Sequence, residues 1–226
     1  MMPNPVRLFH ITAIDNLSAI FEQGRLVSKN AGMLNGINYQ NIAHTGAQSA
    51  RSVKLVPNPP GGNIHDYVPF YFAPRSPMLS AIHNGNVSGC SFRQEDIAHL
   101  ETTVGKVIEM NAEFVFYDLN ATLDYSKPST DLDKLQTEIA WELLTEAPQL
   151  DGFCKYFLNK HTNEKYVDRM ARRQAEFLVK KQVNLSAITK IGVANNTKLE
   201  IVSKILENSS LTLPVEVKTD WYFLGQ

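Results

Sequence analysis

One glutamate in the C-terminal half of the chain lies within a short apolar segment, and this feature limits the possible folds most. The segment Ala175–Val179 ends in aromatic and aliphatic residues and is followed by two lysines, which is typical of a buried strand. Side chains alternate along a strand, so we expect Glu176 on the face opposite Phe177 and Val179. Burying an unpaired carboxylate costs roughly 2 kcal/mol or more. Glu176 is therefore expected to be paired, to lie in a cleft, or to act in a reaction.

The simplest role for Glu176 is structural. Arg172 and Arg173 precede it closely in the sequence, and an edge-strand glutamate paired with either arginine needs no further function. In the alternative interpretation Glu176 is the centre of an enzyme active site. Its immediate neighbours leave both interpretations open, so the rest of the chain has to decide between them.

Length and composition indicate one globular domain spanning residues 1–226. The 226-residue chain is 43% hydrophobic and 20% charged, which is ordinary for a folded domain. Its net charge of −1 provides no global positive field for nucleic acid. Any contact with nucleic acid is therefore expected to come from a local basic patch.

Cysteine content and the absence of long apolar runs predict a cytoplasmic protein with no membrane association. Cys90 and Cys154 are too few for a disulfide framework and lack metal-ligand spacing. The N-terminus has no basic segment followed by an apolar core, and no run of about 18 apolar residues occurs anywhere.

Strands and helices are expected to mix without a regular βαβ rhythm, which favours an α+β fold. A helix capped by Asp15 and closed by Gly24 should follow the first strand, and Pro69 should mark either a strand at a sheet edge or the start of a strand. The patterns predict strands over 6–11, 67–73, 106–110, 175–179, 188–193, 213–217 and 221–224, and helices over 76–83, 94–101, 131–146 and 196–206. The type of 114–117 stays open, and 163–173 can be helix or loop.

Residues 25–63 form a polar, turn-rich stretch with little sustained periodicity. It is rich in asparagine and glycine and contains three prolines between positions 57 and 60. A long stretch of this kind inside a compact domain is usually a functional loop or a lid. Arg51 lies late in it.

Motifs for several common chemistries are absent from the sequence. It has no phosphate-binding glycine loop, no GxGxxG, HExxH or CxxC, and no serine-hydrolase elbow. The six histidines share no local spacing, so no metal site is expected. The residues that remain are Glu176, His10 with Thr12 at a strand end, Arg51, and the aromatic strand with Tyr71. They suit the breaking of a glycosidic bond, because a carboxylate can stabilise an oxocarbenium-like sugar and an arginine can bind a phosphate.

Three stretches resemble the DarT family, bacterial toxins that use NAD to ADP-ribosylate bases in single-stranded DNA. They are Leu8–Thr12 with Asp15–Leu17, Asp66–Leu79, and Arg173–Val179. The closing Asp220–Phe223 is also similar to that family's terminus. The resemblance implies an ADP-ribosyltransferase-like fold with split, mixed β-sheets around an NAD cleft and helices outside.

The resemblance also assigns roles to residues. Glu176 would be the catalytic glutamate, and Arg51 would help catalysis at the target base. NAD, as co-substrate, would contact His10, Thr12, Asn16, Arg51 and Tyr71. Single-stranded DNA would contact Arg75, Met78, Arg172 and Arg173, and a toxin of this kind implies an antitoxin with ADP-ribosyl-DNA hydrolase (macrodomain) activity.

Two regions depart from the family pattern, and two other functions stay open. Tyr117–Asn120 stands where many members have a glycine-containing turn, and the segment from Thr130 to Lys160 is longer than expected. A transferase acting on protein or RNA would keep the same NAD site. A nucleic-acid-binding module without turnover would keep only the fold.

Overall fold

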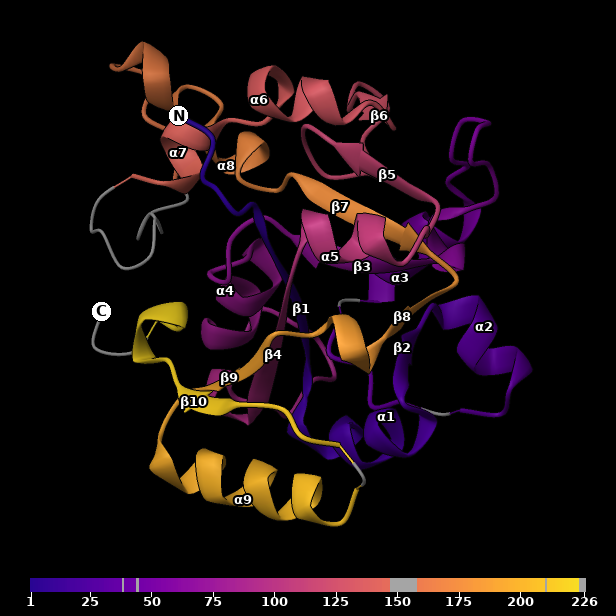
Figure 1. The fold of residues 1–226 in the computed structure, drawn as a ribbon. Helices are drawn as coiled ribbons and strands as arrows, with labels where there is room; N and C mark the ends of the chain where they lie inside the picture. The colour runs from indigo at the N-terminus through magenta and orange to yellow at the C-terminus, as the bar shows by residue number, and fades with distance from the viewer. Residues whose placement is uncertain (38, 44, 147–157, 210, 224–226) are drawn as a thin grey trace.

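An eight-stranded mixed sheet runs through the centre of the computed structural model, which describes residues 1–37, 39–43, 45–146, 158–209 and 211–223 (Figure 1). The strands are β1 (Arg7–Ala13), β2 (Arg25–Val27), β3 (Tyr67–Tyr71), β4 (Ile97–Thr103), β5 (Phe114–Tyr117), β6 (Pro128–Ser129), β7 (Glu176–Lys180), β8 (Gln182–Asn184), β9 (Lys190–Val193) and β10 (Val215–Val217). The large sheet has the order β10-β9-β4-β1-β3-β7-β5-β6, and β2 pairs with β8 separately. β9 and β10 are parallel, whereas the other neighbouring strands are antiparallel.

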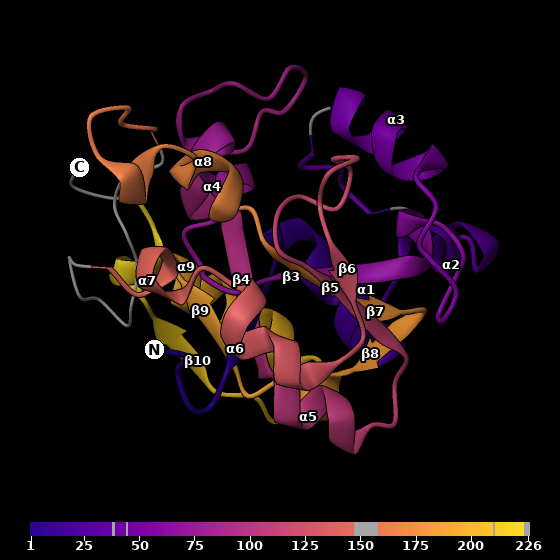
Figure 2. The same cartoon turned by 90° about the horizontal axis from the view of Figure 1, so that it is seen from above.

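Helices lie on both sides of this sheet, and Figure 2 separates α2 and α3 from α5 and α6. The helices are α1 (Leu17–Gln23), α2 (Lys29–Leu34), α3 (Thr45–Val53), α4 (Pro77–His83), α5 (Val104–Glu109), α6 (Leu135–Glu138), α7 (Trp141–Leu144), α8 (Arg169–Arg172) and α9 (Asn196–Glu207). Among the described residues, no helix combines the length and the apolar character needed to cross a bilayer.

The large sheet is split between β1 and β3. These strands pair only at Phe9 and Tyr71, whereas β3 pairs with β7 along its whole length. Pro69 therefore lies in the middle of an interior strand, and the prediction of an edge strand or a strand start was wrong. The carbonyl of Pro69 accepts a hydrogen bond of 2.9 Å from Nδ1 of His10 on β1. Because N and C=O of a strand residue face the same side, the missing N–H of Pro69 faces the gap, where no ladder bond is lost.

Local start and stop signals account for the helices that the sequence predicted well. Gly24 adopts a left-handed φ of 64° and ends α1, as expected for a glycine after the last helical turn. Ser76 accepts a hydrogen bond from the amide of Leu79, and Pro77 opens α4. Asp15 does not cap α1: it lies in a 3₁₀ turn that precedes the helix, so that prediction was wrong.

Four other segments differ from the sequence-based expectation. Residues 94–101 contain a 3₁₀ turn followed by strand β4, which pairs with strands on both sides. Residues 106–110 belong mostly to helix α5, because the Thr103 hydroxyl accepts from the amide of Lys106 and caps it. Residues 131–146 contain two short helices instead of one. Trp221 ends a 3₁₀ turn and does not begin a strand, and residue 224 of the expected strand lies outside the described residues. Long-range packing overrides local periodicity at these places.

The stretch 25–63 is less irregular than its composition indicates. It contains β2, α2 and α3, of which α2 is capped by the Ser28 hydroxyl. A capping box formed by Asn63 and Asp66 then caps the start of the 3₁₀ turn Ile64–Asp66, which leads directly into β3. The stretch therefore places two helices beside the sheet (Figures 1 and 2).

Gly192 of β9 is required by close packing. A Cβ at this position would lie 2.2 Å from a ring carbon of Trp221, which is fully buried. We expect Gly192→Ala to lower the free energy of unfolding by about 1–3 kcal/mol, because the ring has to move within a packed core. Gly105→Ala is the matched control: its Cβ would meet nothing nearer than 3.8 Å. Denaturant unfolding of both variants checks this, and equal stability of the two would contradict the packing argument.

Candidate active site

Glu176 lies at the centre of a row of three side chains that crosses three strands. It stands opposite Tyr71 on β3 and opposite Tyr117 on β5. Directly opposed residues in a sheet share one face. Phe177 and Val179 belong to the main core on the other face, whereas Leu178 packs in a second cluster with Tyr117. The predicted orientation of Glu176 is therefore confirmed.

The charge partner of Glu176 is Arg51, 125 positions earlier in the chain. Nη1 of Arg51, on helix α3, donates to both carboxylate oxygens at 3.0 and 2.9 Å. The Glu176 side chain is 1% exposed and that of Arg51 is 13% exposed. The pair is therefore almost completely removed from water. The structural alternative that paired Glu176 with Arg172 or Arg173 is wrong.

Burial shifts the acid–base properties of this group of residues. It raises the pKa of Glu176 above its ordinary value, although the charge and the hydrogen bond of Arg51 oppose the shift. Burial, followed by the charge of Glu176, also raises the pKa of Tyr117 to about 12. The pKa of Tyr71 is raised for the same two reasons. Both tyrosines therefore keep their protons at neutral pH and can act as hydrogen-bond donors.

Two buried polar atoms beside Glu176 make no hydrogen bond with any residue that the structure describes. They are Nη2 of Arg51 and the hydroxyl oxygen of Tyr117. Buried polar groups are nearly always satisfied, so orphaned donors next to a buried carboxylate indicate a place for a polar ligand. A guanidinium nitrogen and a phenol suit the hydroxyl and phosphate oxygens of a dinucleotide. The residues present therefore fit NAD.

His10 is in the gap between β1 and β3. It is one residue along β1 from Phe9, the residue that pairs with Tyr71, and its ring lies 5.7 Å from that of Phe70. Burial lowers the pKa of His10, and the hydrogen bond to the Pro69 carbonyl opposes this only in part. His10 is therefore neutral at physiological pH. Its place in the gap is compatible with the predicted contact to NAD.

Asn16 holds part of the 25–63 stretch against β1. Its Nδ2 donates to Oγ1 of Thr12 and to the carbonyl of Gln40, both at 3.0 Å, and its Oδ1 accepts from the Gln40 amide at 2.7 Å. Both donors of this buried amide are thus used within the protein. The geometry favours a role in fixing the backbone around Gln40, and the contact with NAD stays a prediction.

Removing the Asn16 side chain should loosen the backbone around Gln40. We expect Asn16→Ala to lower the free energy of unfolding by about 1–3 kcal/mol, because the three hydrogen bonds of the buried Asn16 side chain are lost. Asn84→Ala is the control, since the Asn84 amide donates to the Ser80 carbonyl on the surface. Thermal unfolding of both variants tests the expectation. No difference between them would show that Gln40 is held by other contacts.

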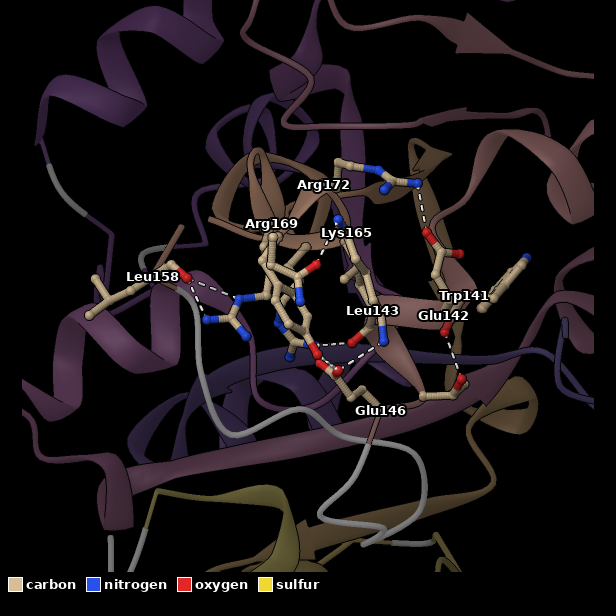
Figure 3. Close-up of polar contacts among 12 residues, drawn as sticks. Trp141, Glu142, Leu143, Glu146, Leu158, Lys165, Arg169 and Arg172 are labelled. Carbon is tan, nitrogen blue, oxygen red and sulfur yellow. Dashed lines mark hydrogen bonds and ion pairs between the residues drawn. The ribbon is translucent and has the colours of Figure 1, made fainter. Parts of the chain in front are cut away.

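The residues predicted to contact DNA are divided between the surface and the interior. Arg172 of α8 is partly exposed, and its Nη2 donates to Glu142 of α7 at 2.8 Å (Figure 3). Met78 is half-buried on α4 and packs against the core. Arg75 is only 2% exposed, and its guanidinium carbon lies 5.9 Å from the centre of the Phe223 ring. Arg173 is 3% exposed and donates to the Leu143 carbonyl.

Helix α8 and the segment before it form a connected polar cluster. Arg169 donates from Nε to the Leu158 carbonyl at 3.0 Å, and its guanidinium carbon lies 4.5 Å from the centre of the Tyr166 ring. Figure 3 shows Lys165 directed at Glu146 of the preceding segment, to which it donates at 2.8 Å. Lys165 and Arg169 are therefore both bound to groups within the protein. Part of the long 130–160 segment, including Cys154, lies outside the described residues.

Sequence reasoning missed two residues of the site, Tyr117 and His65. Tyr117 ends an apolar run whose structure was left open, and only the pairing of β5 with β7 places it beside Glu176. His65 lies next to α3, where its Nε2 is 3.1 Å from Oε1 of Gln48.

Asn120, in the turn that departs from the family pattern, accepts from the amide and hydroxyl of Thr122 and makes a local turn. Within the described residues, no three His, Cys, Asp or Glu side chains gather as metal ligands.

Comparison with known proteins identifies the family. A family model described as "ssDNA thymidine ADP-ribosyltransferase, DarT" matches residues 9–223. The chain belongs to the DarT family. The curated DNA ADP-ribosyl transferase of Thermus sp. (strain 2.9) is 34% identical to it over 223 residues, which cover 98% of each protein. The one from Escherichia coli O127:H6 is 28% identical, with 98% of this chain and 95% of the relative covered.

Solved DarT structures share the whole fold. The structure of Thermus sp. 2.9 DarT in complex with ADP-ribosylated ssDNA matches with a TM-score of 0.86 and 33% identity, covering 98% of both chains. The NAD+ complex of the same protein matches with a TM-score of 0.80 and 32% identity, covering 98% of this chain and all of the other. The predicted ADP-ribosyltransferase-like α+β fold is therefore confirmed, and so is the resemblance to DarT.

Proposed function

We propose that this protein is a DarT toxin that transfers ADP-ribose from NAD to a thymine in single-stranded DNA and releases nicotinamide. Family membership over residues 9–223 supports the activity. The single observation that carries the site is the buried pair of Glu176 and Arg51, flanked by two tyrosines and an unsatisfied guanidinium nitrogen. We treat residues 1–226 as one catalytic domain that acts in the cytoplasm.

Glu176 is the residue that we assign to bond cleavage. The bond between nicotinamide and the ribose carbon breaks, and neutral nicotinamide leaves with the electron pair. The sugar that remains has oxocarbenium character and carries positive charge. A buried carboxylate, fixed by a bond to each of its oxygens, can orient a ribose hydroxyl and stabilise that charge without reorganising.

Arg51 is assigned to the accepting base. A ring nitrogen of the base forms the new bond to the ribose carbon and loses its proton, so that one nicotinamide and one proton are released per transfer. Nη1 of Arg51 donates to Glu176. Nη2 makes no hydrogen bond with the described residues and can therefore donate to a ligand. A guanidinium in this position stabilises the negative charge that develops on the base as its proton leaves. His10, Thr12, Asn16 and Tyr71 surround the NAD side of this site.

The DNA strand is proposed to cross the surface near α4 and α8. Met78 and Arg172 are the predicted contacts that retain exposed surface there, and Arg75 and Arg173 act from within the protein by supporting that surface. A single strand suits the reaction, because a base edge has to leave its stack before it can be modified. The toxin interpretation implies an antitoxin that covers the site or removes the modification through a macrodomain hydrolase.

The deciding experiment incubates the protein with NAD and single-stranded oligonucleotides of varied sequence. The expected result is a mass gain of one ADP-ribose unit on thymine-containing strands and none on strands without thymine. Matched RNA strands and a protein mixture serve as competing substrates. A mass gain only on RNA or protein would overturn the DNA assignment, and DNA binding without any mass gain would favour a module without turnover.

A further inference from the structure

Helix α3 carries Arg51 into the site, yet apolar burial does not hold it. None of its apolar residues is buried. Most helices in proteins are placed by an apolar face, so α3 needs other anchors. Its described side-chain contacts with the rest of the fold are polar. Gln48 bonds to Lys29 and His65, and Arg51 bonds to Glu176. Gln48 and Arg51 are three positions apart and therefore lie on one side of the helix.

Gln48 joins α3 to two other elements. Its Oε1 is 2.8 Å from Nζ of Lys29 at the start of α2 and 3.1 Å from Nε2 of His65. Lys29 is exposed, whereas His65 is buried. An exposed lysine with a flexible side chain contributes little to holding Gln48 in place, so the bond to the buried His65 is the stronger attachment.

His65 is itself held rigidly. Its amide donates to Oδ1 of Asn63 at 2.9 Å, and Oδ2 of Asp66 accepts from the Asn63 amide at 2.8 Å. Asn30 of α2 adds a bond of 2.7 Å to Asp66. β3 follows this turn and leads to Tyr71 in the row that contains Glu176. The turn therefore has a fixed position relative to the catalytic carboxylate.

The protonation state of His65 agrees with a donor role. Burial, followed by the charges of Lys29 and Arg51, lowers the pKa of His65 to about 4, and Asp66 opposes this shift. The ring is neutral at physiological pH and carries one N–H. Since Oε1 of Gln48 is an acceptor, that proton lies on Nε2 and the bond to Gln48 is a neutral hydrogen bond.

We propose that His65 is a positioning residue of the transfer reaction, which fixes Gln48 and thereby holds α3 where Arg51 can bond to both oxygens of Glu176. The proposal rests on the function proposed for Arg51 and Glu176. His65 acts through these residues and has no contact with the reacting atoms assigned to it. A geometric displacement of about 1 Å at a reacting group can cost about 100-fold in rate.

Three variants test the proposal: His65→Ala, His65→Gln and Gln48→Leu. His65→Ala and Gln48→Leu are expected to lower kcat by about 10- to 100-fold, while KM for NAD changes by no more than about twofold. His65→Gln keeps an N–H donor and should recover most of the lost rate. Ser52→Ala, an exposed position on the same helix, is the control and should behave as the parent protein.

A double variant separates positioning from general destabilisation. His65→Ala with Gln48→Leu should be no slower than either single variant, because both remove the same bond. Additive losses, a rise in KM equal to the fall in kcat, or failure of His65→Gln to recover the rate would each overturn the proposal.

A crystal structure of His65→Ala gives a readout that does not depend on activity. The expected result is a displaced α3 in which Nη1 of Arg51 no longer bonds to both oxygens of Glu176. An unchanged Arg51–Glu176 pair would overturn the positioning role even if the rate falls. Failure of the parent protein to modify DNA would instead count against the proposed function, and the crystal structure would still test the inference.

Discussion

Replacing Glu176 with glutamine is expected to lower the rate of ADP-ribose transfer by about 100- to 1,000-fold, the usual effect of removing one preorganised electrostatic group. Glutamine has nearly the same shape and can still accept one bond from Arg51. It lacks the negative charge that stabilises the sugar as nicotinamide leaves. Single-turnover transfer to a thymine-containing strand, followed by mass spectrometry, measures the effect. NAD binding should change less than the rate, because the lost interaction is strongest in the transition state.

Glu142→Gln is the matched control for this substitution. Glu142 lies on α7, is half exposed and pairs with Arg172. The substitution therefore removes one negative charge away from Tyr71, Glu176 and Tyr117. It should retain transfer activity close to that of the parent protein. Equal loss of activity in both variants would mean that net charge matters and that Glu176 has no special role. Full activity of Glu176→Gln would remove the catalytic assignment.

Replacing Arg51 with alanine is expected to affect stability as well as catalysis. It leaves a carboxylate that is 1% exposed without its partner. Breaking a buried ion pair from one side typically costs about 3–5 kcal/mol. The same substitution removes the group proposed to act at the base, so transfer should fall by about 100-fold or more. Lys54→Ala, which removes a positive charge paired with the exposed Asp124, should do neither.

The pH dependence of the Arg51→Ala variant has a definite sign. Burial already raises the pKa of Glu176, and Arg51 opposes that rise, so loss of Arg51 raises the pKa further. A carboxyl group whose pKa is higher in the folded state favours folding at low pH and loses this contribution as pH rises through the folded value. The stability deficit of Arg51→Ala should therefore shrink from pH 8 to pH 5. Any residual reaction should lose its ionised glutamate at a higher pH than the parent protein does. A deficit that is independent of pH would contradict this.

The sequence predicts the fold best where a local signal agrees with the long-range packing. Gly24 and Ser76 end and begin helices through their own backbone and side-chain chemistry, which neighbouring residues do not alter. The strand Ala175–Val179 is recognised because its apolar run is continuous. Residues 94–101 were wrongly assigned to a helix, because β4 is a strand only by virtue of its partners β1 and β9.

The candidate site shows the same limit more sharply. The sequence singled out Glu176 but gave it the wrong arginines, because closeness in sequence is a poor guide to charge pairing across a sheet. Arg172 of helix α8 donates to Glu142 of α7 (Figure 3), and Arg173, just after α8, donates to the Leu143 carbonyl of α7. Arg51 was already a candidate residue, but nothing in the sequence paired it with Glu176. Tyr117 could be placed beside Glu176 only once the register of β5 against β7 was known.

The gap between β1 and β3 gives the sheet two edges in its interior. A strand edge presents unpaired N–H and C=O groups, and proteins normally protect such groups on the outside of the molecule. Here every second backbone group of β1 faces a partner strand that pairs with it only at Phe9. The Pro69 carbonyl in this gap accepts a hydrogen bond from the His10 ring, so a side chain takes the place that a neighbouring strand would occupy. Pro69 is therefore tolerated in a central strand, because its missing N–H lies on the side where β1 and β3 do not pair.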